Sequence, residues 1–498
     1  MKPEDLPSEV RPFVLPRPRG GLVYRCLGCG AKPAIDELLY TCPQCGGLLL
    51  IEDQEFDRLK ETPGHVWRQV FDYRRMLNLP ALKGVFLFHE LVAPLIPLED
   101  VVYLGEGQTP VVAANETLAA QVGRPFFFKN DGQNPSASFK DRGMASALSF
   151  LNHLLKTGRL DRVLAVCAST GDTSAAAALY ASYLSGRVSS AVLLPQGKVT
   201  PHQLSQPLGA GAAVLELPGV FDDCMKVVEK LADDYPVVLL NSKNAWRILG
   251  QETYSFEVAQ AFDWEVEDLA VFVPVGNAGN ITAVMAGFIK LLDLGIINGL
   301  PRIVGVQSEH ADPVYRYYLE SVPAKRRFEP VQVQASVAQA AMIGNPVSMP
   351  RVISLAQEVR RLSGQEPVVV QVSEQEIIEA MLTANQQGHV VCTQGGECLA
   401  GLKVALDQGL LSPNEKAVLD STAHMLKLVD FQTMYFEDSF PPEFEISPRQ
   451  ELQNRPRLIK PQDTPCPAPD RPLGGKELEE FVAAAARMIA EKLGLEPK

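Results

Sequence analysis

Two kinds of segment that direct a chain to or through a membrane are missing from this sequence. No window approaches about 18 consecutive apolar residues, the length needed to span a bilayer. The first 20 residues, MKPEDLPSEVRPFVLPRPRG, also contain no apolar stretch of the kind found in secretory signals. We therefore expect a cytoplasmic protein that has no membrane partner.

Long basic runs, internal repeats and low-complexity tracts are missing as well. The net charge is −13, from 46 Lys and Arg against 59 Asp and Glu. A polyanion such as nucleic acid would need a local basic patch, and we expect no nucleic-acid partner. With 46% hydrophobic and 21% charged residues among 498, the composition is typical of a folded enzyme with two or three domains.

Cysteine is sparse and unevenly distributed. Five of the nine cysteines are scattered and are expected to be reduced thiols: Cys167, Cys224, Cys392, Cys398 and Cys466. The other four form two C-x2-C pairs separated by twelve residues: Cys26, Cys29, Cys42 and Cys45. Four thiolates on two tight turns suit a closed, tetrahedral Zn²⁺ site. Residues 21–52 are therefore predicted to be a zinc ribbon with a structural Zn²⁺; iron or no metal are the alternatives.

From about residue 101 the sequence alternates between strand-like apolar runs and helix-like segments. RVLAVCAST precedes GDTSAAAALYASYLSG, and LAVFVPVG precedes NITAVMAGFIKLLDLG. This alternation predicts an α/β fold with parallel sheets flanked by helices. About 330 residues are too many for one sheet, so we expect two domains with a cleft between them. The predicted parts are a tail (1–20), the ribbon (21–52), a helical connector (53–100), a large domain (101–144 and 246–438), a small α/β domain (145–245), and a Pro-rich linker with a terminal helix (439–498).

Three short motifs each open a helix. They are NPSASFKDRG, which contains Lys140, CASTGDTSAAAA and PVGNAGNITA. Helix N-termini present unpaired N–H groups and bind anions. Any one of these loops alone could be an ordinary turn, and a lone lysine at a helix start is usually solvated. Together they suggest an anionic ligand with an electrophilic carbonyl.

In their order, these motifs resemble those of pyridoxal-phosphate (PLP) enzymes of the tryptophan-synthase-β type, and most of all the threonine synthase family. The resemblance is carried by SFKDRG, STGDTS, GNAGN and STAH, and by YLGEGQTPVV, NSKNAWRILGQETY and AAMIGNPVS. It covers roughly residues 100–430, and an amino-terminal zinc ribbon also occurs in relatives. The fold it implies is the two-domain architecture of fold type II PLP enzymes, with a small zinc ribbon added.

The resemblance also implies roles for individual residues. Lys140 would hold PLP as a Schiff base and move protons between substrate carbons, with Asp172 near the 3′-oxygen of the cofactor and Thr422 at its pyridine nitrogen. The cofactor phosphate would be bound by Gly276, Asn277, Ala278, Gly279 and Asn280. The substrate carboxylate would bind at Ser169, Thr170 and Thr173, and its phosphate at Thr173, Asn241, Ser242, Arg247 and Asn277. Asn241 and Ser242 could instead simply cap the helix that contains Arg247.

The reaction implied by the resemblance is the conversion of O-phospho-L-homoserine and water to L-threonine and phosphate, by a homodimer acting on this phosphorylated amino acid. The alternatives are a cysteate synthase, a threonine or serine dehydratase, and a non-catalytic zinc-ribbon binding module. Two segments depart from the family pattern: PSAS, which contains Ala137, and VCTQGGECLAG. In the second segment, Cys392, Thr393 and Gln394 either contact a ligand or pack in the core.

Overall fold

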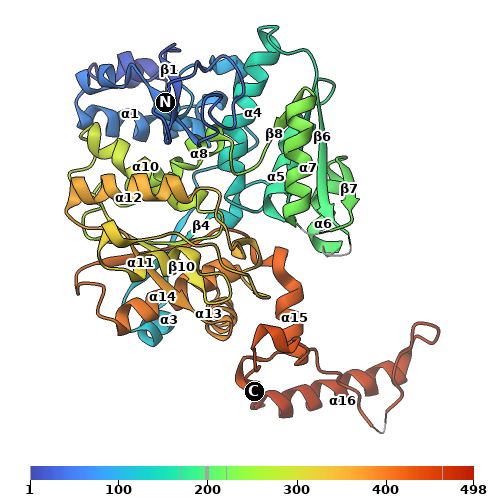
Figure 1. The fold of residues 1–498 in the computed structure, drawn as a ribbon. Coiled ribbons are helices and arrows are strands. Elements are labelled where there is room, and N and C mark those ends of the chain that lie inside the picture. Colours follow the sequence, from blue (N-terminus) through green and yellow to red (C-terminus); the bar gives the residue numbers. More distant parts are fainter. Residues whose placement is uncertain (1, 170, 197–200, 220, 463, 498) are drawn as a thin grey trace.

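The computed structural model describes residues 2–169, 171–196, 201–219, 221–462 and 464–497. Two largely parallel sheets flanked by helices form the body, and a small two-stranded unit lies at the amino-terminal end (Figure 1). The predicted α/β architecture is confirmed. Within the described ranges, no helix is both long and apolar enough to cross a bilayer.

The larger sheet has six strands in the order β11-β10-β9-β12-β4-β3. All neighbours are parallel except β3, which runs antiparallel to β4 at the edge. Every residue of β9 is buried, as expected for a strand covered on both faces. The strands are β3 (Val111–Ala113), β4 (Phe126–Asn130), β9 (Leu269–Pro274), β10 (Arg302–Ser308), β11 (Val368–Val372) and β12 (Lys416–Ser421).

Helices cover both faces of this sheet, and their apolar sides form most of the core. The helices of this domain are α3 (Glu116–Val122), α8 (Ala245–Gln251), α9 (Thr253–Ala261), α10 (Gly279–Asp293), α11 (Pro313–Leu319), α12 (Met349–Ser363), α13 (Glu374–Gln386), α14 (Thr393–Asp407) and α15 (Val429–Glu437). Short 3₁₀ turns are η7 (Asp131–Gln133), η8 (Pro323–Lys325), η9 (Gln339–Ala341) and η10 (Met425–Leu428).

The smaller sheet is fully parallel, with the strand order β7-β6-β5-β8. Its elements are β5 (Val163–Ala168), α5 (Asp172–Tyr183), β6 (Val188–Pro195), α6 (Pro201–Gly209), β7 (Ala213–Leu217), α7 (Phe221–Asp234) and β8 (Val237–Leu239). Helix α4 (Lys140–Lys156) packs against α5 on one side and α8 on the other, so it joins the two parts of the body (Figure 1).

The amino-terminal 100 residues pack onto the body. Strands β1 (Leu22–Cys26) and β2 (Leu49–Asp53) form an antiparallel pair. The segment predicted as a tail contains 3₁₀ turns, yet its Leu6, Val10 and Val14 are buried. The connector contains α1 (Gly64–Met76), α2 (His89–Val92) and the turns η3 (Phe56–Glu61), η4 (Pro80–Leu82), η5 (Gly84–Phe88) and η6 (Leu98–Asp100); the tail turns are η1 (Pro3–Asp5) and η2 (Arg11–Phe13).

The carboxy-terminal segment is irregular until its last helix. Turns η11 (Pro442–Phe444) and η12 (Gln450–Leu452) lie against the body, and Leu452 is buried there. The chain then leaves the body and ends in α16 (Gly475–Leu493), which lies apart from both sheets (Figure 1).

Candidate functional site

The loop before α4 lies against the segment that follows β12. The Phe139 N–H donates to the Thr422 carbonyl over 2.8 Å, and the His424 N–H donates to the Ala137 carbonyl over 3.0 Å. These bonds bring together Lys140, the first residue of α4, and Thr422. Ala137 has φ 64°, a left-handed conformation that costs a non-glycine residue about 1–2 kcal/mol. The departure from the family pattern at Ala137 therefore falls on a strained position of this loop.

Lys140 lies in surroundings that favour its neutral amine. Burial, with a further contribution from the positive charge of Arg247, lowers the pKa of Lys140 to about 7, although Asp172 and Asp420 oppose the shift. Its Nζ lies 3.8 Å from the centre of the Phe139 ring. A neutral amine is the nucleophilic form of lysine, so this residue can react with a carbonyl near neutral pH.

Helix α4 crosses α8 at close range, and glycine makes the crossing possible. A Cβ built on Gly143 would lie 2.7 Å from the Arg247 carbonyl oxygen, and one on Gly250 would collide with the Arg142 carbonyl oxygen. Beside the crossing, Phe150 of α4 stacks on Trp246 of α8 with ring centres 4.0 Å apart. The crossing holds the amine of Lys140 and the guanidinium of Arg247 in one site.

Arg247 is buried, with 3% of its surface exposed, and no counter-ion faces its charge in the described part of the chain. Its Nη1 donates to the Leu240 carbonyl over 3.2 Å, but among the described residues its Nε has no partner and no carboxylate forms an ion pair with it. Burial lowers the pKa of Arg247 to about 10. The amide nitrogen of Asn241 is likewise buried without a partner in the described part of the chain. Donors left unpaired in this way fit a phosphate group.

The loop Gly276–Asn280 leads from β9 into α10. Ala278 has φ 60°, and Gly276 lies so close to η9 that an added Cβ would come within 2.8 Å of the Ala341 Cα. The first N–H groups of α10 have no carbonyl of the same helix to bind, so this turn can bind an anion through its backbone.

The two asparagines of this loop make specific contacts. The Asn277 amide oxygen accepts from the Val347 N–H over 3.4 Å. Asn280 donates to Asp420 over 2.7 Å, and this contact fixes the loop to the end of β12. The Asn280 side chain is therefore engaged with the protein, which leaves its backbone as the group for a ligand.

The loop before α5 carries the residues predicted to receive the substrate carboxylate. Ser169 Oγ accepts from the Gly171 N–H over 3.3 Å, and Thr173 lies partly exposed in the first turn of α5. Thr170 lies outside the described residues. Asp172 forms an ion pair with Lys427 of η10 over 2.9 Å, so an ionic contact joins the smaller sheet to the segment after Thr422. Sequence reasoning missed Lys427, although it follows the STAH motif by three residues.

The start of α14 contributes further polar groups near Thr422. Cys392 Sγ lies 3.9 Å from Thr422 Oγ1, and it also accepts from the Gly395 N–H. Thr393 Oγ1 and both amide atoms of Gln394 are buried, with no partner in the ranges described. This segment therefore packs in the core and also carries unpaired polar groups near Thr422.

A buried ionic network anchors the helix that begins with Lys140. Arg142 donates to Asp131 over 2.8 Å and to Glu257 of α9 over 2.7 Å. Lys129 of β4 donates to Glu257 over 2.6 Å, and Thr109 donates to Asp131 over 2.6 Å. Burial alone would raise the pKa of Glu257, but Arg142 and Lys129 lower it to about 2. Sequence reasoning missed this network because its members come from four separate elements and from the loop that contains Thr109.

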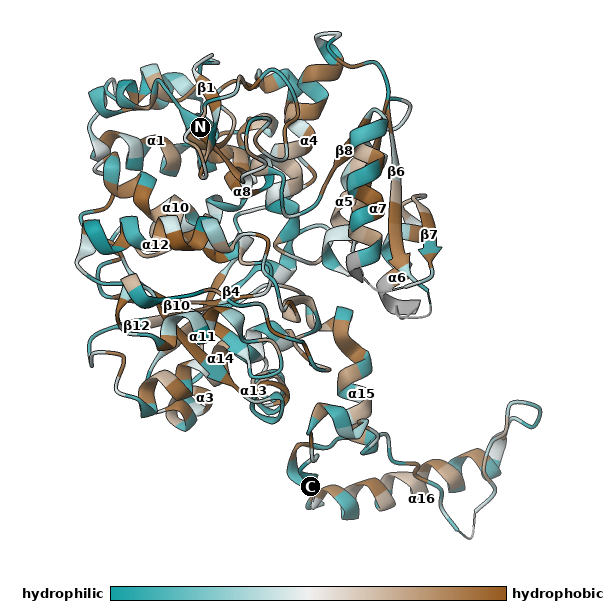
Figure 2. Cartoon of the chain, in the orientation of Figure 1, coloured by the Kyte–Doolittle hydropathy of each residue, from teal (hydrophilic) through white to brown (hydrophobic). Residues whose placement is uncertain are grey.

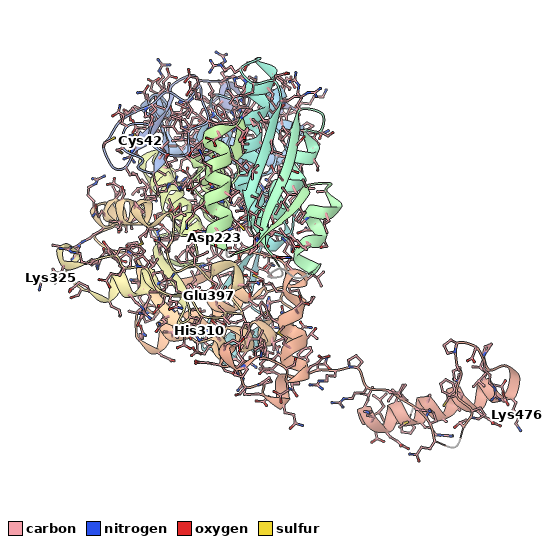
Figure 3. All side chains as sticks on the ribbon, turned by 45° about the vertical axis from the view of Figure 1, so that its right-hand side comes forward. Cys42, Asp223, His310, Lys325, Glu397 and Lys476 are labelled. Atoms are coloured by element: carbon pink, nitrogen blue, oxygen red, sulfur yellow. The ribbon has the colours of Figure 1, made fainter. Side chains whose placement is uncertain are left out.

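The four clustered cysteines converge on one point in the amino-terminal unit. Their sulfur atoms all lie within 4.8 Å of one another, with Cys26 and Cys45 3.4 Å apart and Cys29 and Cys42 3.7 Å apart. A Cβ on Gly47 would lie about 3.0 Å from Cys26 Sγ and 3.1 Å from Cys45 Sγ, so a larger residue there would crowd the sulfur atoms. The donor set fits a tetrahedral metal ion of the zinc type. Figure 3 shows Cys42 in the amino-terminal part of the molecule.

This cysteine unit also packs against the segment that leads to Arg247. Tyr40 Oη accepts from the Leu239 N–H over 2.9 Å, and Trp246 Nε1 donates to Tyr24 Oη over 3.3 Å. Arg351 of α12 joins the two parts, since it donates to the Leu49 carbonyl over 2.7 Å and to the Ser242 carbonyl over 2.9 Å. The Nη1 and Nη2 atoms of this buried guanidinium thus bind backbone carbonyls of the cysteine unit and of the segment before Arg247.

The fold and the lysine site define a class of proteins, and comparison with known proteins agrees. The family profile "Pyridoxal-phosphate dependent enzyme" matches residues 102–421. Threonine synthase 2, chloroplastic, of Arabidopsis thaliana is 35% identical over 410 residues, which are 81% of this chain and 76% of that protein. Threonine synthase of Methanocaldococcus jannaschii is 36% identical over 409 residues, which are 82% and 93% of the two chains.

A solved structure shares the fold. The crystal structure of threonine synthase from Escherichia coli superposes with a TM-score of 0.59 at 20% identity, over 82% of this chain and 90% of that one. The chain therefore belongs to the pyridoxal-phosphate-dependent enzymes and, among them, to the threonine synthase family. The family predicted from the motifs is confirmed.

Proposed function

We infer that the chain is a threonine synthase, which converts O-phospho-L-homoserine and water to L-threonine and phosphate. The observation that carries this inference is the pairing of a reactive lysine with a buried, uncompensated arginine across the α4–α8 crossing. A phosphorylated amino acid matches these two groups, because its amino-acid end would lie at Lys140 and its phosphate at Arg247. Relatives that are threonine synthases over most of their length support the same reading.

The residues around Lys140 fit a bound PLP. The backbone of Gly276–Asn280 would hold its phosphate, with Thr422 at the ring nitrogen and Asp172 near the 3′-oxygen. Near Lys140, the buried hydroxyl oxygens of Ser136 and Ser138 have no partner among the residues that the structure describes, so they are further polar groups available to a ligand. When bound, PLP supplies an electron sink for carbanions formed at the substrate carbons. Lys140 would move protons among Cα, Cβ and Cγ of the substrate, a task suited to an amine with a pKa of about 7.

The substrate would lie between the α5 loop and α8. Arg247 would bind the phosphate together with Asn241, Ser242, Thr173 and Asn277. The substrate carboxylate would meet Ser169, Thr170 and Thr173 at the start of α5. In this arrangement Arg247 and its neighbours would bind the phosphate both while it is part of the substrate and after it has left as a product.

Three further proposals complete the function. Cys26, Cys29, Cys42 and Cys45 bind one structural Zn²⁺, because four thiolates leave no open position for catalysis. The enzyme is a homodimer, the commonest symmetric assembly. It works in the cytoplasm.

The decisive experiment is product identification with the PLP-loaded enzyme. We expect O-phospho-L-homoserine to give equal amounts of threonine and phosphate, and Lys140→Ala to give neither and to lack the visible absorption of the bound cofactor. Phosphoserine with sulfite, and serine or threonine alone, are the matched alternative substrates. Cysteate from the first or an oxo acid from the second, formed faster than threonine from phosphohomoserine, would contradict the inference.

A further inference from the structure

The last helix of the chain has an apolar side that the rest of the molecule leaves open. None of the residues of α16 is buried, although the helix runs from Gly475 to Leu493. It lies outside both sheets at the end of a Pro-rich segment, and Figure 3 shows Lys476 well apart from the labelled residues of the body. Figure 2 shows apolar and polar residues alternating along it.

The apolar residues of α16 fall on one stripe. After Leu478, they follow at 3, 4, 7, 10, 11 and 15 positions further along the sequence. This is the pattern of a helix that packs lengthwise against another helix. Val482 is 54% exposed, Ile489 40% and Leu493 67%. The stripe consists of Leu478, Phe481, Val482, Ala485, Met488, Ile489 and Leu493.

The charges along α16 are divided between its two halves. The first half contains Glu477, Glu479 and Glu480 against one lysine, and the second contains Arg487 and Lys492 against one glutamate. Two such helices side by side in the same direction would bring like charges together. In opposite directions, acidic and basic halves would face each other.

The centre of the helix is suited to a two-fold axis. Residues 483–486 are four consecutive alanines, and Ala485 lies on the apolar stripe. Small side chains at a crossing point allow two helices to approach closely. With the axis at Ala485, Glu477 is eight residues before it and Lys492 seven residues after it, so each Glu477 would meet the Lys492 of the other helix.

We propose that α16 binds the α16 of a second copy of this chain, antiparallel and with its two-fold axis at Ala485. The apolar stripe supplies the contact, and the charge division sets the direction. A two-fold contact of this kind uses the same surface on both copies. The proposal does not depend on the reaction catalysed at Lys140.

A cysteine placed on the axis tests this arrangement in the full-length enzyme. In a Cys466→Ser background, Ala485→Cys is expected to form a covalent dimer rapidly under mild oxidation. Arg487→Cys is the matched control, because two residues further on the side chain points about 200° around the helix and away from the partner. The Cys466→Ser parent, treated in parallel, accounts for the other thiols. Equal cross-linking of the Ala485→Cys and Arg487→Cys chains, or none in either, would overturn the proposal.

A charge exchange tests the direction of the pairing. Lys492→Glu should lower the rate of Ala485→Cys cross-linking about three- to tenfold, because it places like charges at both ends. Adding Glu477→Lys should restore the rate, while each variant keeps its threonine-forming activity. A single change without effect on cross-linking, or a double change that weakens it further, would exclude the antiparallel pair. Loss of activity in the parent would instead count against the proposed function alone.

Discussion

At the scale of single residues, Arg247, which we propose binds the substrate phosphate, shows how a binding residue can lower the stability of the folded protein. A buried charge without a counter-ion raises the free energy of the folded state. The burial that lowers its pKa to about 10 has the same physical origin. An anionic ligand would compensate the charge, so we expect bound phosphate to stabilise the folded protein relative to the ligand-free protein.

Replacement of Arg247 should therefore have opposite effects on activity and stability. Arg247→Met is expected to lower kcat/KM for O-phospho-L-homoserine about 100-fold or more, because a charge-assisted contact to phosphate is lost. The same change should leave unfolding of the ligand-free chain unaffected or raise its Tm, since no ion pair is broken.

Arg351→Met is the matched control for this substitution. Arg351 is also buried, but its guanidinium donates to three backbone carbonyls and to the Ser348 hydroxyl, and we expect its loss to lower Tm. Steady-state kinetics and thermal denaturation measure both effects. A drop in Tm with unchanged kinetics for Arg247→Met would show that Arg247 has a structural role only.

At the scale of elements, the cysteine unit matters because of what it packs against. Its strands and tyrosines contact residues 239–246, directly before Arg247. Leu50 of β2 also packs with Ile248 of α8. A structural change in the cysteine unit is therefore expected to displace the residues proposed to bind the substrate phosphate more than it displaces Lys140.

Removal of one cysteine tests this link. Cys42→Ser should reduce bound zinc from about one ion per chain to little or none, since one of four ligands is lost. We expect KM for O-phospho-L-homoserine to rise severalfold while PLP is still bound. Metal analysis, cofactor absorbance and kinetics give the three readings. Cys466→Ser, outside the cluster, should change none of them, and a zinc-free Cys42→Ser with wild-type KM would exclude the link.

At the scale of the whole molecule, the ionic network of Lys129, Asp131, Arg142 and Glu257 joins β4, α4 and α9. Its charges balance in pairs and are almost fully buried. Because Arg142 follows Lys140 by two residues, the network determines where the reactive lysine lies relative to the larger sheet.

Neutralising Glu257 should destabilise the protein. Glu257→Gln is expected to cost about 3–5 kcal/mol of unfolding free energy, because two buried cations lose one of their two carboxylate partners. Glu358→Gln, which removes an exposed ion pair with Arg361, should cost less than about 1 kcal/mol. Chemical denaturation of both variants measures the difference, and equal effects would contradict a special role for the network.

The network also predicts a dependence on pH. The pKa of Glu257 is about 2 in the folded protein and near its ordinary value of 4.5 when unfolded. Its stabilisation is therefore complete above about pH 4.5 and is lost as the pH falls toward 2. The difference in stability between the wild type and Glu257→Gln should shrink over this range.

The alternation of strands and helices predicted the fold. The motifs SFKDRG, STGDTS, GNAGN and STAH predicted the family and the proposed site residues. They could do so because strands, helix starts and metal-binding turns are each encoded within a few neighbouring residues. The contacts of Arg351 with Leu49, of Lys427 with Asp172 and of Glu257 with Arg142 join distant parts of the chain. Such pairs leave no periodic pattern in one sequence.

The glycine crossing of α4 and α8 has a consequence for selectivity. Because Gly143 and Gly250 let the two helices touch through their backbones, the separation between the backbones at Lys140 and Arg247 is set by two rigid elements. In the proposed site, we expect a substrate shorter by one methylene to span the two groups less well. The close crossing of α4 and α8 therefore predicts that the proposed site prefers phosphohomoserine to phosphoserine, although the two glycines themselves carry no functional group.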